Sequence, residues 1–398
     1  MRPSQEREEG LLEAMTPRKR LLNTLQGKPV DRVPVHPQLP FALGPDGFRP
    51  GAFHGYGDHD DWREQDPLYS EIIDRVEKEC DSFFIWRPPC MLSEPFFVPL
   101  SMTRSEPPVE IDGMIVTTKV LETPGGRLSA VSAVRPGTGH TWEIEHFCKS
   151  PKDARMLMEL PWEGHPPEIG NYHQLKGWLG DKGLIWVTIP SPLLVVCRLF
   201  DPMEFLMIIR DEEALVYELM DLAAERIGAN LLALLQAGVG PVIRFGGAEH
   251  ATPPMMSPED FDRLVVNYDK PLMDMCRDHG CFVAVHCHGH LRHALQRFRE
   301  MGVDQTDPVE SIPDGNLTLR KARAIASDRI TLTGNIQMRE LHTEEPEAIE
   351  KRVRQILDEA GPGKLVVSTT GTPLERITPR LAANYHRLID TVLEFGRT

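Results

Sequence analysis

The sequence predicts a (β/α)8 barrel, or TIM barrel, with an N-terminal helix and an antiparallel β insertion around residues 90–148. Eight short apolar runs of strand type occur along the chain, and a segment of helical pattern follows each of them. No glycine-rich fingerprint follows the first run, which disfavours the alternative of a doubly wound open sheet. The length of 398 residues suits one barrel domain, residues 1–398, that carries insertions.

The N-terminal part contains a helix, a strand, a second helix and a second strand. Thr16 is the expected N-cap and Pro17 the first helical residue, and Gly27 ends this helix. Residues 31–36 form the first predicted strand, residues 67–79 a helix and residues 82–86 the second strand. The order of these elements is that of a barrel's first two units.

Residues 90–148 interrupt the alternation. Three segments in this region are strand-like, and Gly-Gly and Pro-Gly pairs mark the turns between them. The predicted strands are residues 111–121, 127–134 and 141–147. We therefore expect an antiparallel insertion within the barrel domain.

After the insertion the alternation is regular. The predicted strands are residues 184–188, 242–245, 282–286, 303–306, 330–333 and 365–367. The predicted helices are residues 202–236, divided near Asp211, and residues 258–279, 291–301, 317–326, 346–360 and 379–395.

Composition excludes several classes of function. The formal net charge is −15 and no basic patch offsets it, so the chain does not bind nucleic acid. No segment approaches the roughly 18 apolar residues of a membrane span. The seven cysteines form no CxxC pair and their number is odd, which favours reduced thiols and a cytoplasmic location.

The strongest signal for chemistry is the end of the strand at residues 282–286. Side chains alternate along a strand, so His286 and His288 point the same way and Cys287 points to the helix layer. Two imidazoles at a strand's carboxyl end can bind one divalent metal, with Glu249 as a third ligand and an open fourth position. The alternative is a polar barrel mouth in which the imidazoles only form hydrogen bonds.

Other polar residues also follow predicted strands. Glu249 is a candidate general base or metal ligand, or else a salt-bridge partner of Arg244. Acidic residues Asp307 and Glu310 follow the next strand, and we assign a catalytic role to Glu310. Further candidates are catalytic Asn335 and the substrate-binding residues His36, Trp86, Arg244, His250 and Gln337. Asn335 and Gln337 can instead cap the next element, and Trp86 can instead belong to the core.

Several segments, in order along nearly the whole chain, resemble the uroporphyrinogen decarboxylase superfamily. These are residues 15–22 (MTPRKRLL) with Gly27 and residues 31–35 (DRVPV), residues 257–261 (SPEDF), residues 302–304 (GVD) with Glu310, residues 334–336 (GNI), and Thr378-Pro379 with Asn384. The resemblance implies a (β/α)8 barrel and a possible homodimer. It also implies one of two activities: cofactor-free decarboxylation, or zinc-dependent methyl transfer that works with corrinoid proteins or coenzyme M.

The chain departs from both branches. The Gln-Ala-Gly-Arg stretch of the decarboxylases is missing, since residues 37–41 read PQLPF. The methyltransferase branch of the family that the chain resembles has a His-x-Cys-Gly pattern at the end of this strand and a second Cys after the last strand. Here residues 286–289 read HCHG and residues 368–371 read STTG, so the donors are nitrogen and oxygen. Such a set suits Zn²⁺ or another divalent metal.

We therefore predict a metal-dependent methyltransferase that moves a methyl group from an O- or N-methylated small molecule to a corrinoid protein. One alternative is a cofactor-free decarboxylase that binds a polycarboxylated, porphyrinogen-like substrate through Arg32, Arg87 or Arg244. Others are a metal-dependent lyase or hydrolase and a non-catalytic ligand-binding barrel. No GxSxG elbow, Walker A loop or HExxH motif is present in the sequence.

Overall fold

A computed structural model of the chain describes residues 14–39, 41–44, 47–50, 62–92, 96–136, 141–162, 164, 167–361 and 363–397. Its central sheet has eight parallel strands in the order β1-β15-β14-β13-β12-β11-β10-β4. The bounds are β1 Val35–His36, β4 Ser82–Trp86, β10 Gly183–Pro190, β11 Val242–Gly246, β12 Phe282–His286, β13 Gln305–Asp307, β14 Thr331–Ile336 and β15 Leu365–Thr369. The N–H of Asp81 donates to the carbonyl of Val35 at 2.8 Å, so the two end strands nearly close the sheet. The predicted barrel is confirmed.

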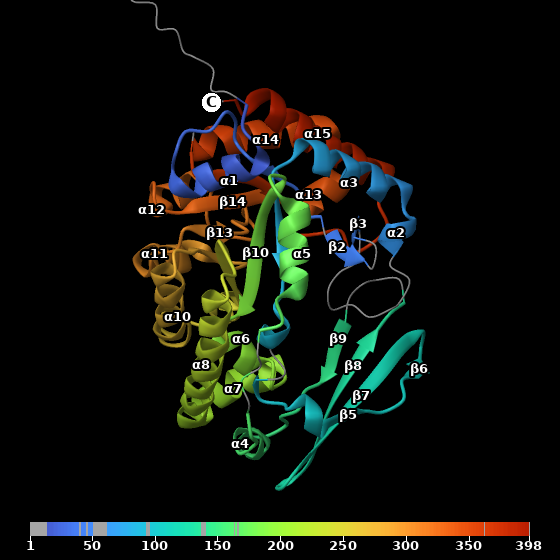
Figure 1. Ribbon diagram of the computed structural model, residues 1–398, viewed down its shortest axis with the longest axis vertical. Helices are drawn as coiled ribbons and strands as arrows, with labels where there is room; N and C mark the ends of the chain where they lie inside the picture. Colours follow the sequence, from blue (N-terminus) through green and yellow to red (C-terminus); the bar gives the residue numbers. More distant parts are fainter. Residues whose placement is uncertain are drawn as a thin grey trace, which may run out of the picture.

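Helices surround this sheet (Figure 1). Their bounds are α1 Pro17–Gln26, α2 Trp62–Gln65, α3 Pro67–Glu79, α4 Pro151–Met158, α5 Gly170–Leu179, α6 Pro192–Cys197, α7 Pro202–Asp211, α8 Glu213–Gln236, α9 Pro258–Phe261, α10 Asn267–Asp278, α11 Leu291–Met301, α12 Leu319–Ala326, α13 Met338–Thr343, α14 Pro346–Ala360 and α15 Pro379–Phe395. Short 3-10 helices are η1 Pro89–Met91, η3 Leu100–Met102 and η4 Ala248–Ala251. The predicted helix at residues 258–279 is interrupted by a π-helix, η5 Asp262–Val266, a local widening that periodicity does not reveal.

Helix α1 packs against one end of the barrel interior. Thr16 caps it by accepting a hydrogen bond from the Lys19 N–H, and Gly27 ends it in the left-handed conformation, as predicted. The interior cluster consists of Leu21, Leu25, Phe83, Leu184, Trp186, Val242, Ala284 and Val366. Because this cluster takes alternate residues from the strands, it identifies the side of each strand that faces inward.

Strand β12 shows the alternation that positions the site. Ala284 belongs to the interior cluster, whereas Val283, Val285 and Cys287 belong to the larger core between the sheet and the helices. His286 therefore points into the barrel, and Cys287 faces the helix layer as the sequence predicts.

The insertion forms a separate antiparallel sheet on the side of the barrel to which β10 points (Figure 1). Its strands are β5 Thr103–Ser105, β6 Val109–Ile111, β7 Met114–Thr123, β8 Gly126–Val134 and β9 Thr141–Glu145, and a separate hairpin is formed by β2 Phe41–Gly44 and β3 Gly47–Pro50. The predicted strand at residues 111–121 is wrong at its start. Asp112 and Gly113 have positive φ and turn the chain between β6 and β7, as an Asp-Gly pair often does in a hairpin.

Candidate functional site

Two imidazoles lie together at the carboxyl end of β12. The rings of His286 and His288 are nearly perpendicular, with centroids 4.7 Å apart. Nδ1 of His286 is 3.1 Å from Oδ2 of Asp307, and Nδ1 of His288 is 3.1 Å from Oε1 of Glu310. Parallel pairing of β12 with β13 sets His286 beside Asp307 and so supplies the first of these carboxylates. Each histidine is thus oriented by its own acid.

Arg244, on the inner face of β11, lies deeper in the barrel than the two imidazoles and contacts this group. Its Nε and Nη2 donate to the two carboxylate oxygens of Asp307 at 3.0 and 2.7 Å, and Nη2 is 2.6 Å from Nδ1 of His286. The guanidinium also lies over the Trp186 ring, 4.8 Å from its centroid. The role of Arg244 in substrate binding stays a prediction. Its charge is already matched by Asp307, and the alternative partner Glu249 is not the one it uses.

The side chains of the group differ in exposure. The imidazoles of His286 and His288 are 23% and 40% exposed, whereas Arg244 and Asp307 beneath them are 6% and 0% exposed. The charged groups are therefore buried, and the histidine rings form the surface that a ligand meets.

Protonation differs between the two histidines. Burial lowers the pKa of His286 and the Arg244 charge lowers it further, so this ring is neutral at pH 7. Burial also acts to lower the pKa of His288, but the hydrogen bond and charge of Glu310 outweigh it and raise that pKa. The pKa of each carboxyl is lowered despite burial, Asp307 by Arg244 and His286, and Glu310 by His288 and the Gly289 N–H.

These contacts decide which ring nitrogens are available. An ionised Glu310 only accepts hydrogen bonds, so Nδ1 of His288 donates and its Nε2 carries a lone pair when the ring is neutral. Nδ1 of His286 touches both an acceptor, Asp307, and a donor, Arg244. In the neutral ring, Nε2 therefore carries a lone pair when Nδ1 donates to Asp307, and it carries the proton when Nδ1 accepts from Arg244.

Glu249 lies on η4, directly after β11. Its Oε2 accepts a hydrogen bond from the Gly247 N–H at 3.1 Å. Within the described part of the chain, no group of three or more His, Cys, Asp or Glu residues is arranged to hold a metal ion. Glu249 as a third ligand or general base therefore remains a prediction. His250, beside it, is exposed and lines a cavity of about 250 Å³ with Cys197, Met255 and Met256.

His36 and Trp86 are both buried, and substrate binding by His36 stays a prediction. The His36 ring meets Phe83 and Trp186 edge-on inside the barrel, where burial lowers its pKa to about 3. Trp86 points outward into the core and donates from Nε1 to Asn171 at 3.2 Å. The alternative core role for Trp86 is the one that the structure adopts.

Asn335 and Gln337 are buried at the end of β14. Oδ1 of Asn335 accepts a hydrogen bond from Arg352 at 3.0 Å, and Oε1 of Gln337 accepts one from Thr370 at 2.8 Å. Gln337 also occupies the N-cap position of α13, where its N–H donates to Glu340. The capping alternative therefore describes Gln337, and the catalytic role of Asn335 remains a prediction.

Asp307 is the residue whose role the sequence left unassigned. The predicted strand ends at residue 306, whereas β13 spans Gln305–Asp307. Alternation along the strand could have placed Asp307 on the same side as Gln305, on the face opposite to Thr306. That inference requires the strand to extend to residue 307, and the end of a three-residue strand is hard to read from sequence.

The comparisons with known proteins place the chain. The family model for uroporphyrinogen decarboxylase (URO-D) matches residues 166–392, more than half of the chain. The chain belongs to the uroporphyrinogen decarboxylase family. This confirms the resemblance found in the sequence motifs, and no curated protein matches the sequence.

A solved methyltransferase structure shares the fold. A methyltransferase from Methanosarcina mazei is similar with a TM-score of 0.58 and 16% sequence identity, covering 96% of this chain and 99% of its own. A B12-independent methionine synthase from Shewanella sp. W3-18-1 aligns with a TM-score of 0.38 and 14% identity, covering 75% and 78%. No helix in the described residues of this family member is long and apolar enough to cross a membrane.

Proposed function

We propose that this member of the uroporphyrinogen decarboxylase family is a metal-dependent methyltransferase. It takes a methyl group from an O- or N-methylated small molecule and passes it to a corrinoid protein. The observation that carries the proposal is the pair of partly exposed imidazoles, each held at Nδ1 by a buried or half-buried carboxylate. Metal-binding histidines are typically oriented in this way, with the second nitrogen directed to the ion.

The donor chemistry fits a divalent metal. His286 and His288 would supply two imidazole nitrogens, and Glu249 is the proposed third, oxygen ligand. When bound, such a metal supplies Lewis acidity toward the oxygen or nitrogen that carries the methyl group. The chain's own residues hold the site in order: Asp307 and Arg244 fix the His286 ring, and Glu310, held by the Gly289 N–H, fixes the His288 ring.

Two further features support the proposal, the first for metal binding and the second for the fold. The neutral state of His286 at pH 7 is the state that a metal ligand needs. The fold is also that of the Methanosarcina mazei methyltransferase over almost the full length of both chains.

The decarboxylase alternative needs arginines that can bind substrate carboxylates, and two of its three candidates are already paired within the protein. Arg244 is paired with Asp307, and Arg32 is paired with Asp81 and donates to the Glu79 carbonyl. These two cations are therefore already satisfied within the protein.

Metal content tests the proposal. Elemental analysis of purified protein after zinc reconstitution should give about one metal per chain for the wild type and a small fraction of that for His286→Ala or His288→Ala. His279→Ala is the matched control, because His279 is exposed near the opposite end of β12 and should not change the stoichiometry. Glu310→Gln should weaken zinc binding by about 10- to 100-fold, as loss of a ligand-orienting group does. A metal-free wild type would overturn the metal's role.

Methyl transfer requires its own assay. Methylation of cob(I)alamin by a panel of methyl ethers and methylamines can be followed by absorbance, with His286→Ala as the negative control. A metal-loaded protein that methylates no cob(I)alamin would contradict the methyltransferase and favour a metal-dependent lyase or hydrolase.

A further inference from the structure

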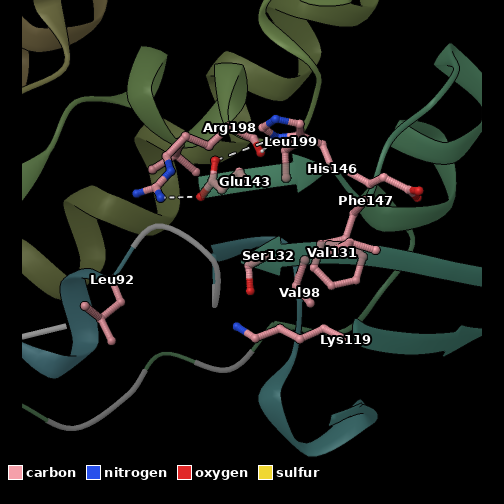
Figure 2. A pocket seen from close by; sticks show the side chains of 13 residues that line it. Leu92, Val98, Lys119, Val131, Ser132, Glu143, His146, Phe147, Arg198 and Leu199 are labelled. Atoms are coloured by element: carbon pink, nitrogen blue, oxygen red, sulfur yellow. Dashed lines mark hydrogen bonds and ion pairs between the residues drawn. The ribbon is translucent and has the colours of Figure 1, made fainter. Parts of the chain in front are cut away.

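Two adjoining cavities lie where the inserted sheet meets the barrel. The larger one, about 340 Å³, is bounded by residues of β7, β8 and β9 and by the end of α6 (Figure 2). The smaller one, about 250 Å³, is bounded by residues of α6, α7 and η4. Glu143, His146 and Arg198 line both cavities and therefore form the boundary between them. Among the described residues, a member of η4 lines only the smaller cavity.

The wall of the smaller cavity is mainly apolar. Phe200, Phe205 and Met256 are buried and belong to the main core, which holds them in place. The other apolar residues of the lining are Leu194, Cys197, Pro202, Leu206 and Met255. Small-molecule sites typically have such a wall, together with a few polar groups that orient the ligand. Since a cavity of about 150 Å³ already holds benzene, the smaller cavity has room for a six-membered ring with a substituent.

The charged groups of this lining cancel. Glu143 and Arg198 form an ion pair with each other, and Nδ1 of His146 donates to the Arg198 carbonyl oxygen at 3.0 Å (Figure 2). An ionised ligand would lose water on entering this cavity without finding an unmatched counter-charge there, which costs free energy. The cavity therefore favours an uncharged ligand.

One polar side chain of the lining is available to a ligand. His250 is exposed, and its imidazole forms no hydrogen bond or ion pair with the described residues. It belongs to η4, which contacts both α6 and β12. Directly after η4, Oγ1 of Thr252 lies 3.4 Å from the carbonyl oxygen of His288. This short helix therefore connects the cavity wall with the segment that carries the histidine pair.

We propose that the smaller cavity binds a small uncharged molecule that has an apolar ring and one oxygen able to form a hydrogen bond. The ring lies against Phe200, Phe205 and Met256, and the oxygen contacts the imidazole of His250. A hydroxyl suits either tautomer of this imidazole, because it both donates and accepts. The inference concerns binding alone and does not depend on the proposed methyl transfer, since it uses none of the proposed metal ligands.

The probe for the test is benzyl alcohol, and its matched partners are the benzoate anion and the benzylammonium cation. Ligand-observed NMR titration of the full-length protein at pH 7 should show saturable binding of the alcohol and at least about tenfold weaker binding of either ion. His250→Ala should weaken binding of the alcohol about fivefold, as loss of one hydrogen bond does. The same variant should leave the affinity for toluene unchanged, because toluene has no oxygen.

Further variants fix the location of the probe. Leu206→Trp and Met255→Trp each place a large ring in the smaller cavity from a different segment, and both should abolish binding. Met207→Trp is the matched control, because Met207 is 61% exposed on the same helix as Leu206 and does not line the cavity. His286→Ala should also leave binding intact, which separates this site from the metal-dependent function.

Thermal unfolding followed by circular dichroism identifies the variants that are folded. Absence of saturable binding, or binding of either ion as tight as that of the alcohol, would overturn the proposal. So would wild-type affinity for the alcohol in His250→Ala or in a folded Leu206→Trp or Met255→Trp variant, or loss of binding in His286→Ala.

Discussion

The ion pair of Arg244 and Asp307 should be a strongly coupled stabilising unit of the barrel. Both side chains are almost completely buried, and two hydrogen bonds join them. Removing one partner leaves the other without a counter-charge in a place that water does not reach, which costs about 3–5 kcal/mol. We therefore expect Asp307→Asn and Arg244→Met each to lower the free energy of unfolding by about that amount.

The double variant distinguishes this reasoning from a simple loss of contacts. When both groups are replaced, no charge stays buried without a partner, and much of the cost disappears. The two effects should therefore not add, with an interaction free energy of about 3 kcal/mol. Urea unfolding at pH 7, followed by fluorescence for all four proteins, measures it.

An exposed pair provides the control. Arg320 and Asp358 are 2.8 Å apart, but their side chains are 64% and 76% exposed. Arg320→Met and Asp358→Asn should each change stability by about 0.5 kcal/mol or less, with coupling below about 1 kcal/mol. Additive effects at Arg244 and Asp307, or single effects as small as at the exposed pair, would refute the reasoning.

Four other substitutions test separate parts of the structure. Burial acts to raise the pKa of Asp260, but hydrogen bonds from Arg263, Ser257 and Arg210 outweigh it and lower this pKa from 3.8 to about 2. The ionised carboxylate therefore stabilises the folded protein above about pH 4, and this stabilisation is lost as the pH falls through 2. Asp260→Asn should therefore cost about 2 kcal/mol in urea unfolding at pH 7 and less at pH 3, and an equal cost at both would contradict this. Burial and the Glu249 charge raise the pKa of Asp269, whose oxygens have no hydrogen-bond partner among the described residues. Asp269→Asn should therefore stabilise the protein increasingly as pH rises above about 4 in the same assay, whereas a constant difference would not fit. Gly247→Ala should lower the free energy of unfolding by about 1–3 kcal/mol, since the φ of Gly247 is 121° and an added Cβ would lie 2.4 Å from Cβ of Leu194. Gly177→Ala, at an exposed position of α5 where nothing lies within 4 Å of the added Cβ, should instead raise the free energy of unfolding by about 1 kcal/mol. Similar changes for the two glycine variants would count against the clash.

Much of the fold could be predicted because each of its signals is local. Barrel strands are buried on both faces, so β10, β12 and β15 appear in the sequence as continuous apolar runs. Caps such as Thr16 before α1 mark helix starts within a few residues. The split of residues 111–121 into two strands was missed because the apolar pattern resumes directly after the Asp-Gly turn.

The site was predicted only in part because its contacts are not local. Alternation along one strand predicts the shared side of His286 and His288 and the outward direction of Cys287. The environment of His36, by contrast, is made by Phe83 and Trp186, which follow it by many residues. Pairing of Asp307 with Arg244 depends on the register of three neighbouring strands, and an error of one residue reverses the side on which a side chain lies.

The order of burial in the site favours an electrophile over an anionic substrate. An anion entering the barrel mouth would meet the imidazoles first, while Arg244 lies beneath them with its charge already matched by Asp307. To recruit this arginine, a substrate carboxylate would have to displace Asp307 and leave it buried, at a cost of several kcal/mol. A divalent cation would require no such displacement, because Asp307 and Glu310 could keep their hydrogen bonds to Nδ1 while the Nε2 atoms would be the proposed ligands. Glu310 would also offset part of the positive charge that such a cation brings, whereas Asp307 is already paired with Arg244.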